Sequence, residues 1–289
     1  MSRIAYVDGR YLPHRRAGVS VEDRGYQFAD GVYEVIAVLG GRLVDEDLHL
    51  ERLNRSLDEL RIRWPMSRAA LRLVMREMIR RNRIRAFGSL YLQVTRGVSP
   101  RNHAFPTSAE PVLVMTARTL PPFDLEAAKR GISVISAPDE RWRRPDIKTV
   151  SLIPNVLAKQ RAVESGAFES WLLDVDGMVT EGTASNAWIV TEGGDLVTHA
   201  ADRSILAGIT RTSLLRLARE HGVRLVERPF SLVEAKRARE AFLTSTTSWV
   251  KAVVRIDDAT IGNGAAGPLT RRLLDWYTAY VAGDGETSR

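Results

Sequence analysis

Residues 145–160 read "PDIKTVSLIPNVLAKQ" and hold Lys148 and Lys159, two of only five lysines in a chain with 37 arginines. Arginine stays protonated and delocalised, so only lysine can supply an amine that loses its proton and attacks an aldehyde. The alternating residues after Lys148 predict extended backbone, and a helix is expected to begin after Pro154. The stretch therefore joins an extended segment to a helix and raises the question of which lysine serves chemistry.

Four of the five lysines have simple interpretations from their neighbours. Lys159 lies in "NVLAKQRAVE", a helical stretch in which a solvent-facing side chain is the simpler interpretation. Lys129 and Lys236 also lie on polar helical stretches, and Lys251 fits a strand with no motif around it. Lys148 belongs to extended structure that we expect in the second domain. Its neighbours alone leave open a catalytic amine or a structural salt bridge.

Composition indicates a globular chain and excludes several kinds of chemistry. The chain has 289 residues with 44% hydrophobic content and 27% charge, which fits one large domain or two smaller ones. It has no apolar run of membrane-spanning length and no signal peptide, so we expect a cytoplasmic protein without membrane contact. It also has no cysteine, which excludes disulfides, a thiolate nucleophile and a cysteine-based zinc site. No metal site is predicted.

The net charge of +7 raises the question of nucleic-acid binding. The arginines are spread over the whole chain, and the densest patches, at 80–85 and 141–144, lie in no recognisable nucleic-acid-binding motif. We expect no nucleic-acid partner. A basic binding module that reuses an enzyme fold remains the alternative from a different functional class.

Residues 1–120 predict hairpins followed by helices. Asp8-Gly9 forms a turn inside the segment 4–12, and Gly40-Gly41 forms another inside 32–44. Apolar residues at helical spacing predict two amphipathic helices, formed around Leu50, Leu53, Leu57 and Leu60 and around Leu71, Val74, Met75, Met78 and Ile79. Strands are expected at 89–95 and 111–117, followed by a linker at 118–124.

Residues 121–289 predict mostly strands with interleaved helices. Strands are expected at 131–137, 170–181 and 186–199. Helices are expected to start near Gly208, Ser231 and Pro268. "GNGAAG", at 262–267, matches a dinucleotide-binding pattern, but it lies too near the end of the sequence for the acidic residue that this motif requires, so we interpret it as a turn.

Six segments, taken in order, resemble the class IV aminotransferases, which depend on pyridoxal phosphate. These segments are 21–35, 94–106, 146–160, 179–188, 205–211 and 242–248. The resemblance implies a two-domain α+β fold, with a small N-terminal α/β sandwich at 1–120. The larger domain at 121–289 would be a mostly β pseudo-barrel with helices that anchors the cofactor. It also implies a homodimer.

The resemblance gives roles to the residues that would hold pyridoxal 5′-phosphate. Lys148 would form the Schiff base with the cofactor and then move a proton at the substrate Cα. Glu181 would pair with the pyridine nitrogen and keep it protonated. Arg52 would bind the phosphate. Two backbone segments would assist it, the helix start at Ile209 and Thr210 and the hydroxyl-rich turn at Ser245 and Thr246. Without the resemblance, these residues also fit caps, turns or solvated charges.

The substrate class follows from three expected carboxylate contacts. Arg101 and His103 are two positions apart, so in extended backbone both side chains point to one side. With Tyr33, this trio resembles the D-amino-acid transaminases, in which the neighbouring subunit supplies the arginine and histidine. The resemblance implies transfer of an amino group from a D-amino acid such as D-alanine to a 2-oxo acid such as 2-oxoglutarate, by a ping-pong mechanism that alternates between pyridoxal and pyridoxamine phosphate.

Several alternatives share the same fold. They are a branched-chain transaminase, an (R)-amine transaminase and an aminodeoxychorismate lyase. Trp142, Trp188 and Trp249 lie near presumed site segments, and they leave the preferred side chain of the substrate open.

Overall fold

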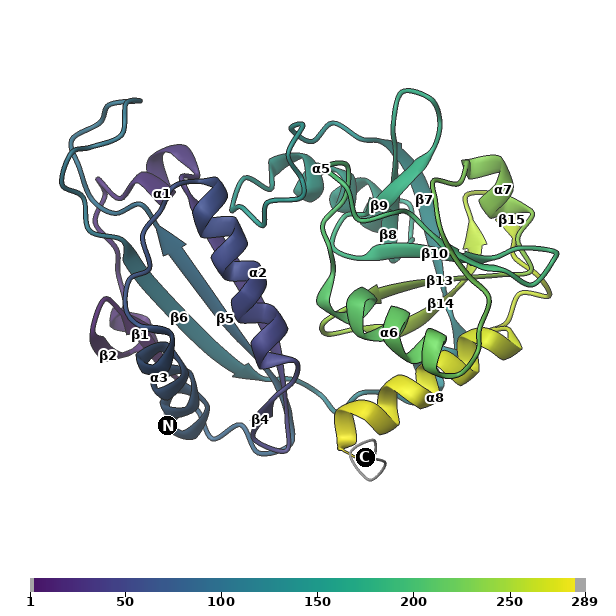
Figure 1. The fold of residues 1–289 in the computed structure, drawn as a ribbon, viewed down its shortest axis with the longest axis horizontal. Helices are drawn as coiled ribbons and strands as arrows, with labels where there is room; N and C mark the ends of the chain where they lie inside the picture. Colours follow the sequence, from purple (N-terminus) through teal and green to yellow (C-terminus); the bar gives the residue numbers. More distant parts are fainter. Residues whose placement is uncertain (1–2, 284–289) are drawn as a thin grey trace. The chain divides into compact units, whose positions relative to one another are not determined.

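The computed structural model describes residues 3–283, which belong to two compact units (Figure 1). Unit 1 holds the chain up to Pro122 together with Ile147–Ser151. Unit 2 holds Phe123–Asp146 and the chain from Leu152 onward. The sequence places Lys148 in the second domain, whereas the segment that carries it joins unit 1.

Backbone hydrogen bonds explain why Ile147–Ser151 joins unit 1. Tyr33 N donates to Lys148 O at 3.0 Å, and Val150 N donates to Gly31 O at 3.1 Å. The Ile147 side chain is 4% exposed and packs in the hydrophobic core of the same unit. Both polar and apolar groups of the segment are therefore satisfied by unit 1.

The centre of unit 1 is a six-stranded antiparallel sheet in the order β2-β1-β6-β5-β3-β4. Its strands are β1 (Ile4–Val7), β2 (Arg10–Pro13), β3 (Gly31–Leu39), β4 (Arg42–Leu43), β5 (Phe87–Thr95) and β6 (Val112–Thr119). The predicted turns at Asp8-Gly9 and Gly40-Gly41 close the hairpins β1–β2 and β3–β4. Both are confirmed, and all four turn residues have a positive φ.

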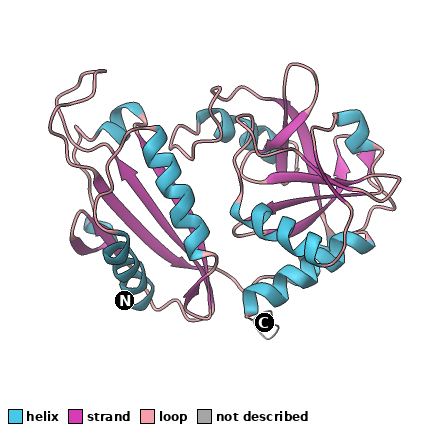
Figure 2. Cartoon of the chain, in the orientation of Figure 1, coloured by secondary structure: helices cyan, strands magenta, loops and turns pink. Residues whose placement is uncertain are grey.

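Helices α2 (Glu46–Glu59) and α3 (Arg68–Arg81) pack on this sheet, as the leucine and methionine spacing predicts (Figures 1 and 2). The Oγ of Ser67 caps α3 by accepting a hydrogen bond from Ala70 N at 3.2 Å. Two short helices, η1 (His14–Arg16) and α1 (Arg24–Phe28), precede β3. The buried side chains of α2, α3 and the sheet form one hydrophobic cluster.

A cluster of charged groups lies buried between β3 and α2. The Glu34 carboxylate is fully buried and accepts hydrogen bonds from Arg52 Nε at 2.8 Å and Arg52 Nη2 at 2.7 Å. His49 Nδ1 lies 2.7 Å from the same carboxylate. Burial raises the pKa of Glu34, but the charge of Arg52 and its hydrogen bonds outweigh burial and lower the pKa to about 2.

Unit 2 is built on a nine-stranded sheet in the order β12-β11-β10-β13-β14-β7-β8-β9, with β15 paired to β14. Its strands are β7 (Ile132–Pro138), β8 (Glu169–Leu173), β9 (Val179–Gly182), β10 (Asn186–Val190), β11 (Leu196–Thr198), β12 (Leu225–Glu227), β13 (Glu240–Ser245), β14 (Trp249–Ile256) and β15 (Ala259–Thr260). The predicted strand segment 170–181 is divided into β8 and β9, which form an antiparallel pair.

Helices pack on the sheet of unit 2 (Figure 2). They are α4 (Leu125–Arg130), α5 (Ile153–Glu164), α6 (Ile209–Glu220), α7 (Leu232–Lys236) and α8 (Pro268–Ala282). The helix starts predicted near Gly208, Ser231 and Pro268 are confirmed. Residues 262–267 form the predicted turn ahead of α8. Within residues 3–283, no helix combines the length and apolar character that crossing a bilayer requires.

Replacing Glu34 with Gln tests the buried cluster. The substitution leaves the Arg52 guanidinium buried without its carboxylate, so we expect the free energy of unfolding to fall by about 3–5 kcal/mol, as measured by urea denaturation at pH 7. Because the pKa of Glu34 is lowered from 4.5 to about 2, the wild-type contribution is complete above pH 4.5 and is lost as the pH falls toward 2.

Glu77→Gln is the matched control. Glu77 also pairs with two arginines, but both Arg80 and Arg81 are exposed. We expect no measurable loss of stability from this substitution. An equal loss in the Glu34 and Glu77 variants would contradict the special weight given to the buried cluster.

Candidate active site

Lys148 is fixed through its backbone and presents its amine beside an aromatic ring. Its N–H donates to Ser56 Oγ at 3.3 Å, and its carbonyl accepts from Tyr33 N. Its Nζ lies 4.3 Å from the centre of the Tyr33 ring. Among the described residues of unit 1, no carboxylate forms an ion pair with this amine. In unit 1, therefore, Lys148 is placed beside Tyr33 and makes no salt bridge.

Two further side chains surround Tyr33. The register of β3 and β5 pairs Tyr33 with Gln93 and Val35 with Tyr91. Tyr91 lies 5.7 Å from Tyr33 between ring centres, and its hydroxyl donates to Gln93 Oε1 at 2.7 Å. Burial and the neighbouring Tyr33 raise the pKa of Tyr91 to about 12. Sequence reasoning missed Tyr91 and Gln93, although their alternation along β5 places them on one face of the sheet.

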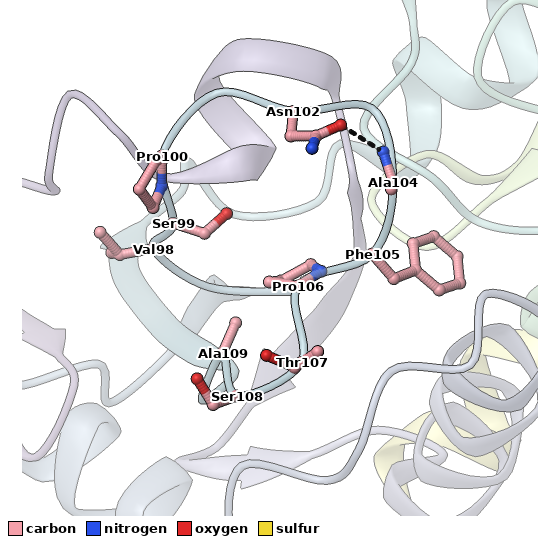
Figure 3. Close-up of a pocket in the computed structure, with 10 residues that line it drawn as sticks. All are labelled: Val98, Ser99, Pro100, Asn102, Ala104, Phe105, Pro106, Thr107, Ser108 and Ala109. Carbon is pink, nitrogen blue, oxygen red and sulfur yellow. Dashed lines mark hydrogen bonds between the residues drawn. The ribbon is translucent and has the colours of Figure 1, made fainter.

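Arg101 and His103 lie on the segment 97–110 between β5 and β6, here called the clamp loop. Both side chains are exposed. Figure 3 shows the loop folded around a hollow whose lining residues include neither Arg101 nor His103. The two side chains instead share one aromatic support. The Arg101 guanidinium lies 4.5 Å from the centre of the Phe28 ring, and the His103 ring lies 5.2 Å from it.

Arg52 is held inside unit 1 rather than displayed on a helix surface. It is 8% exposed, and Glu34 accepts from two of its nitrogens. Sequence reasoning treats Arg52 as a phosphate ligand or a helix-surface charge and misses its buried partner. The reason is that Glu34 lies on a strand 18 positions earlier, outside the range of helical spacing.

In unit 2, Glu181 ends up buried with several donors around it. Its side chain is 6% exposed and forms an ion pair with Arg141. Oε2 accepts from Asn186 Nδ2 at 2.9 Å, and Oε1 accepts from Leu206 N at 3.1 Å. Burial raises the pKa of Glu181 to about 7, although Arg141 and the Leu206 N–H oppose this effect.

Asp139 holds Arg141 in place. Arg141 Nε donates to Asp139 Oδ1 at 2.8 Å, and Arg141 Nη2 donates to Asp139 Oδ2 at 2.7 Å. Thr180 Oγ1 also donates to Asp139 Oδ2 at 2.8 Å. Sequence reasoning counts Arg141 only as part of a dense basic patch, because its partner Glu181 is 40 residues away.

The start of α6 lies against the same group of residues. The N-cap is Gly208, and no side chain caps the helix, so the N–H groups at Ile209 and Thr210 face the helix start without a side-chain acceptor. Asn186 Nδ2 donates to Leu206 O at 3.0 Å. A Cβ at Gly208 would clash with Asn186 Oδ1. Asn186 therefore joins the Glu181 carboxylate to an uncapped helix start, which is an anion-binding arrangement.

Ser245 and Thr246 lie at the same end of the unit 2 sheet. The register pairs Asn186 on β10 with Thr244 on β13, and Ser245 follows directly. Ser245 Oγ accepts from Ser248 N at 3.2 Å within the turn that leads to β14. Strand pairing thus brings the predicted hydroxyl-rich turn next to Asn186, the residue that contacts Glu181.

The three tryptophans near these segments differ in burial. Trp188 is fully buried, stacks on Phe242 with ring centres 5.4 Å apart and donates to Thr244 Oγ1 at 2.9 Å. Trp249 is 4% exposed and stacks on Phe123 with ring centres 4.1 Å apart. Trp142 is 43% exposed. Trp188 is therefore a core residue of unit 2, and Trp142 keeps a surface that a ligand can contact.

The chain is similar to known proteins over nearly its whole length. The sequence model of the family described as amino-transferase class IV matches residues 31–256. The chain is 43% identical to the D-alanine aminotransferase of Bacillus licheniformis over 267 residues, which cover 92% of this chain and 93% of that protein. It is 37% identical to the D-alanine aminotransferase of Staphylococcus haemolyticus, over 96% of this chain and 97% of that protein.

Solved structures give the same picture of the fold. A thermophile branched-chain amino acid aminotransferase, solved with pyridoxamine 5′-phosphate, matches with a TM-score of 0.91 and 25% identity, over 99% of this chain and 96% of that chain. The Escherichia coli branched-chain amino acid aminotransferase matches with a TM-score of 0.90 and 23% identity, over 100% and 97% of the two chains.

Glu181→Gln tests the electrostatics of the buried carboxylate in cofactor-free protein. Because the pKa of Glu181 is raised from 4.5 to about 7, the folded state holds a proton that the unfolded state has lost between these pH values. Wild-type stability should therefore fall as the pH rises through this window, by at most about 1.4 kcal/mol per pH unit. The Gln variant should lack this slope in urea unfolding at pH 5, 6, 7 and 8.

Glu164→Gln provides the control, since Glu164 is an exposed residue of α5. It should keep the wild-type slope. If the wild type and Glu181→Gln change in parallel with pH, Glu181 does not titrate in this range.

Proposed function

This chain belongs to the class IV aminotransferases, and we propose that it transfers the amino group of a D-amino acid such as D-alanine to a 2-oxo acid such as 2-oxoglutarate. The observation that carries this proposal is the 43% identity to a D-alanine aminotransferase over 92% of the chain. The cofactor is pyridoxal 5′-phosphate, which serves both half-reactions in turn.

The residues present fit this cofactor. Unit 1 offers the Lys148 amine beside the Tyr33 ring, and unit 2 offers the buried Glu181 carboxylate next to the uncapped start of α6. An aldehyde needs an amine, a pyridine nitrogen needs a carboxylate, and a phosphate needs aimed N–H groups. When bound, the cofactor supplies the aldehyde and a ring that accepts the electrons released at the substrate Cα.

Each residue then has a role that follows from its chemistry. Lys148 Nζ holds the cofactor aldehyde and moves the proton at the substrate Cα. Glu181 accepts the pyridinium hydrogen bond while Arg141 and Asn186 keep its carboxylate oriented. A phosphate set consists of Ile209, Thr210, Ser245, Thr246 and Arg52, the last with its guanidinium fixed by Glu34.

The substrate carboxylate is assigned to Tyr33, Arg101 and His103. A guanidinium fork and an imidazole next to each other provide charged donors for one carboxylate. Phe28 keeps Arg101 and His103 together on the clamp loop. With the carboxylate held on one side, Lys148 meets the Cα hydrogen of only one configuration, which gives the reaction its stereochemistry.

We place the working site in a homodimer, in which Arg101 and His103 serve the site of the partner subunit. Exposed apolar residues beside the clamp loop support this arrangement. Val21 is 77% exposed, Tyr26 is 76% exposed and Val98 is 42% exposed. A backbone bridge between Asp23 and Val98 keeps their segments adjacent. Large exposed apolar side chains that gather in this way are typical of protein interfaces.

The first test locates the covalent link. Borohydride reduction of the yellow holoenzyme, followed by peptide mapping, should place the label on Lys148, because the amine bound to the cofactor is the one that is reduced in place. Lys148→Ala should remain unlabelled and inactive. Lys159→Ala, altered in the same stretch, should still carry the label on Lys148. A label on another lysine, or a colourless protein that binds nucleic acid, would overturn the proposal.

The second test concerns the substrate carboxylate. Arg101→Ala should lower kcat/KM for D-alanine by about 100-fold, because a charged bidentate contact is lost. Offering D-alanine, L-leucine and (R)-phenylethylamine separately identifies the true donor, which alone bleaches the visible absorption of the cofactor. If Arg101→Ala turns over D-alanine normally, the carboxylate assignment is wrong and the (R)-amine transaminase gains support.

A hybrid dimer tests the exchange of residues between subunits. Arg101→Ala and Lys148→Ala should both be poorly active alone. Co-expression and refolding together should restore activity, because one of the two sites in the hybrid then has Lys148 from one subunit and Arg101 from the other. Mixtures that stay as inactive as the separate variants would place Arg101 in the same subunit as the Lys148 that it serves.

A further inference from the structure

Arg24 is a buried cation that contacts the clamp loop. It is 3% exposed and begins α1, whose N-cap Asp23 accepts from Gly25 N at 2.8 Å. Arg24 Nε donates to Asp30 Oδ2 at 2.8 Å. Burial raises the pKa of Asp30, but hydrogen bonds and charge from Arg96 and Arg24 outweigh burial, and the pKa falls below its usual value. Arg24 therefore sits on an ionised carboxylate inside unit 1.

The other nitrogens of Arg24 hold the backbone of the clamp loop. Nη1 donates to the carbonyl oxygens of Asn102 and Ala104, the latter at 3.3 Å, and Nη2 lies 3.4 Å from the carbonyl of His103. Three consecutive carbonyls thus converge on one guanidinium. A planar fork with five donors can make such a set of bonds, whereas a point-charge ammonium cannot.

The same guanidinium lies beside the aromatic ring that supports the clamp side chains. Arg24 is 4.8 Å from the centre of the Phe28 ring, and Arg101 is 4.5 Å from it. The His103 ring lies 5.2 Å from Phe28 at an angle of 48°. Arg24 therefore fixes both the backbone under the clamp residues and the ring against which they rest.

A second buried arginine holds a different part of unit 1. Arg96 shares Asp30 through Nε at 2.7 Å, but its other bonds go to the carbonyls of Leu60 and Arg61. Its guanidinium lies 3.6 Å from the centre of the Phe105 ring. Arg96 thus has the same carboxylate partner as Arg24, while its backbone acceptors lie outside residues 102–104. It is a natural control.

We propose that Arg24 is a positioning residue for the substrate carboxylate, which orients Arg101 and His103 by holding the carbonyls of residues 102–104. This inference rests on the proposed function. Exposed side chains on a loop lose freedom when they bind a ligand, and a loop that is ordered in advance reduces that loss. Arg24 therefore governs how tightly an amino acid binds, while the proton transfer itself stays with Lys148.

Arg24→Lys in the holoenzyme tests this role. Lysine keeps a positive charge for Asp30 but cannot hold three carbonyls, so we expect KM for D-alanine to rise by about 10- to 100-fold. The value of kcat should change by less than about threefold, because binding of the ground state and of the transition state is weakened equally. The visible absorption of the bound cofactor should be unchanged. Arg96→Lys should keep KM near the wild-type value.

Hydrogen exchange of the peptide that contains 101–104 gives a readout that does not depend on turnover. It should speed up in Arg24→Lys and not in Arg96→Lys. A wild-type KM in Arg24→Lys, whatever its exchange rate, would overturn the positioning role, and so would an equal rise of KM in both variants. A wild-type enzyme that fails to use D-alanine would instead overturn the proposed function, which separates the two failures.

Discussion

A guanidinium withdrawn from water must find acceptors for five N–H groups, and unit 1 is organised around this constraint. Asp30 accepts from Arg24 and Arg96, and Glu34 accepts from Arg52. These carboxylates lie at the start of β3 and just before it, so the sheet carries the negative charges and the helices and loops supply the arginines. The same bonds that stabilise the fold therefore determine where the clamp loop lies.

Unit 2 uses the same chemistry for a different purpose. Arg141 is divided between Asp139 and Glu181, so the buried Glu181 carboxylate has a cationic partner of its own before any ligand is considered. The Leu206 N–H and the Asn186 amide complete its surroundings. A carboxylate with donors on both oxygens keeps one orientation, and such a fixed acceptor can discriminate between protonated and neutral forms of a ring nitrogen.

Much of the fold could be predicted from local patterns, and the remainder depends on distant partners. Leucine spacing predicts α2, and glycine-containing turns predict the hairpins, because these signals lie within a few residues of each other. In contrast, Arg24 and Arg141 look like ordinary surface charges in the sequence, since the carbonyls at 102–104 and the Glu181 carboxylate are 40 to 80 positions away. The segment Ile147–Ser151 has the same limitation. Motif resemblance singles out Lys148 and Glu181, whereas the residues that orient them required the structure.

The return of Ile147–Ser151 to unit 1 affects how the protein is made on the ribosome. Unit 1 is interrupted by Phe123–Asp146, so its last backbone bonds, including that from Tyr33 N to Lys148 O, cannot form until residue 151 has left the exit tunnel. Ile147 likewise completes the hydrophobic core only at that stage. A gene cut after the codon for Pro122 would encode a sheet without this closing segment. Co-translational maturation of the first unit therefore waits for the arrival of the lysine on which the chemistry depends.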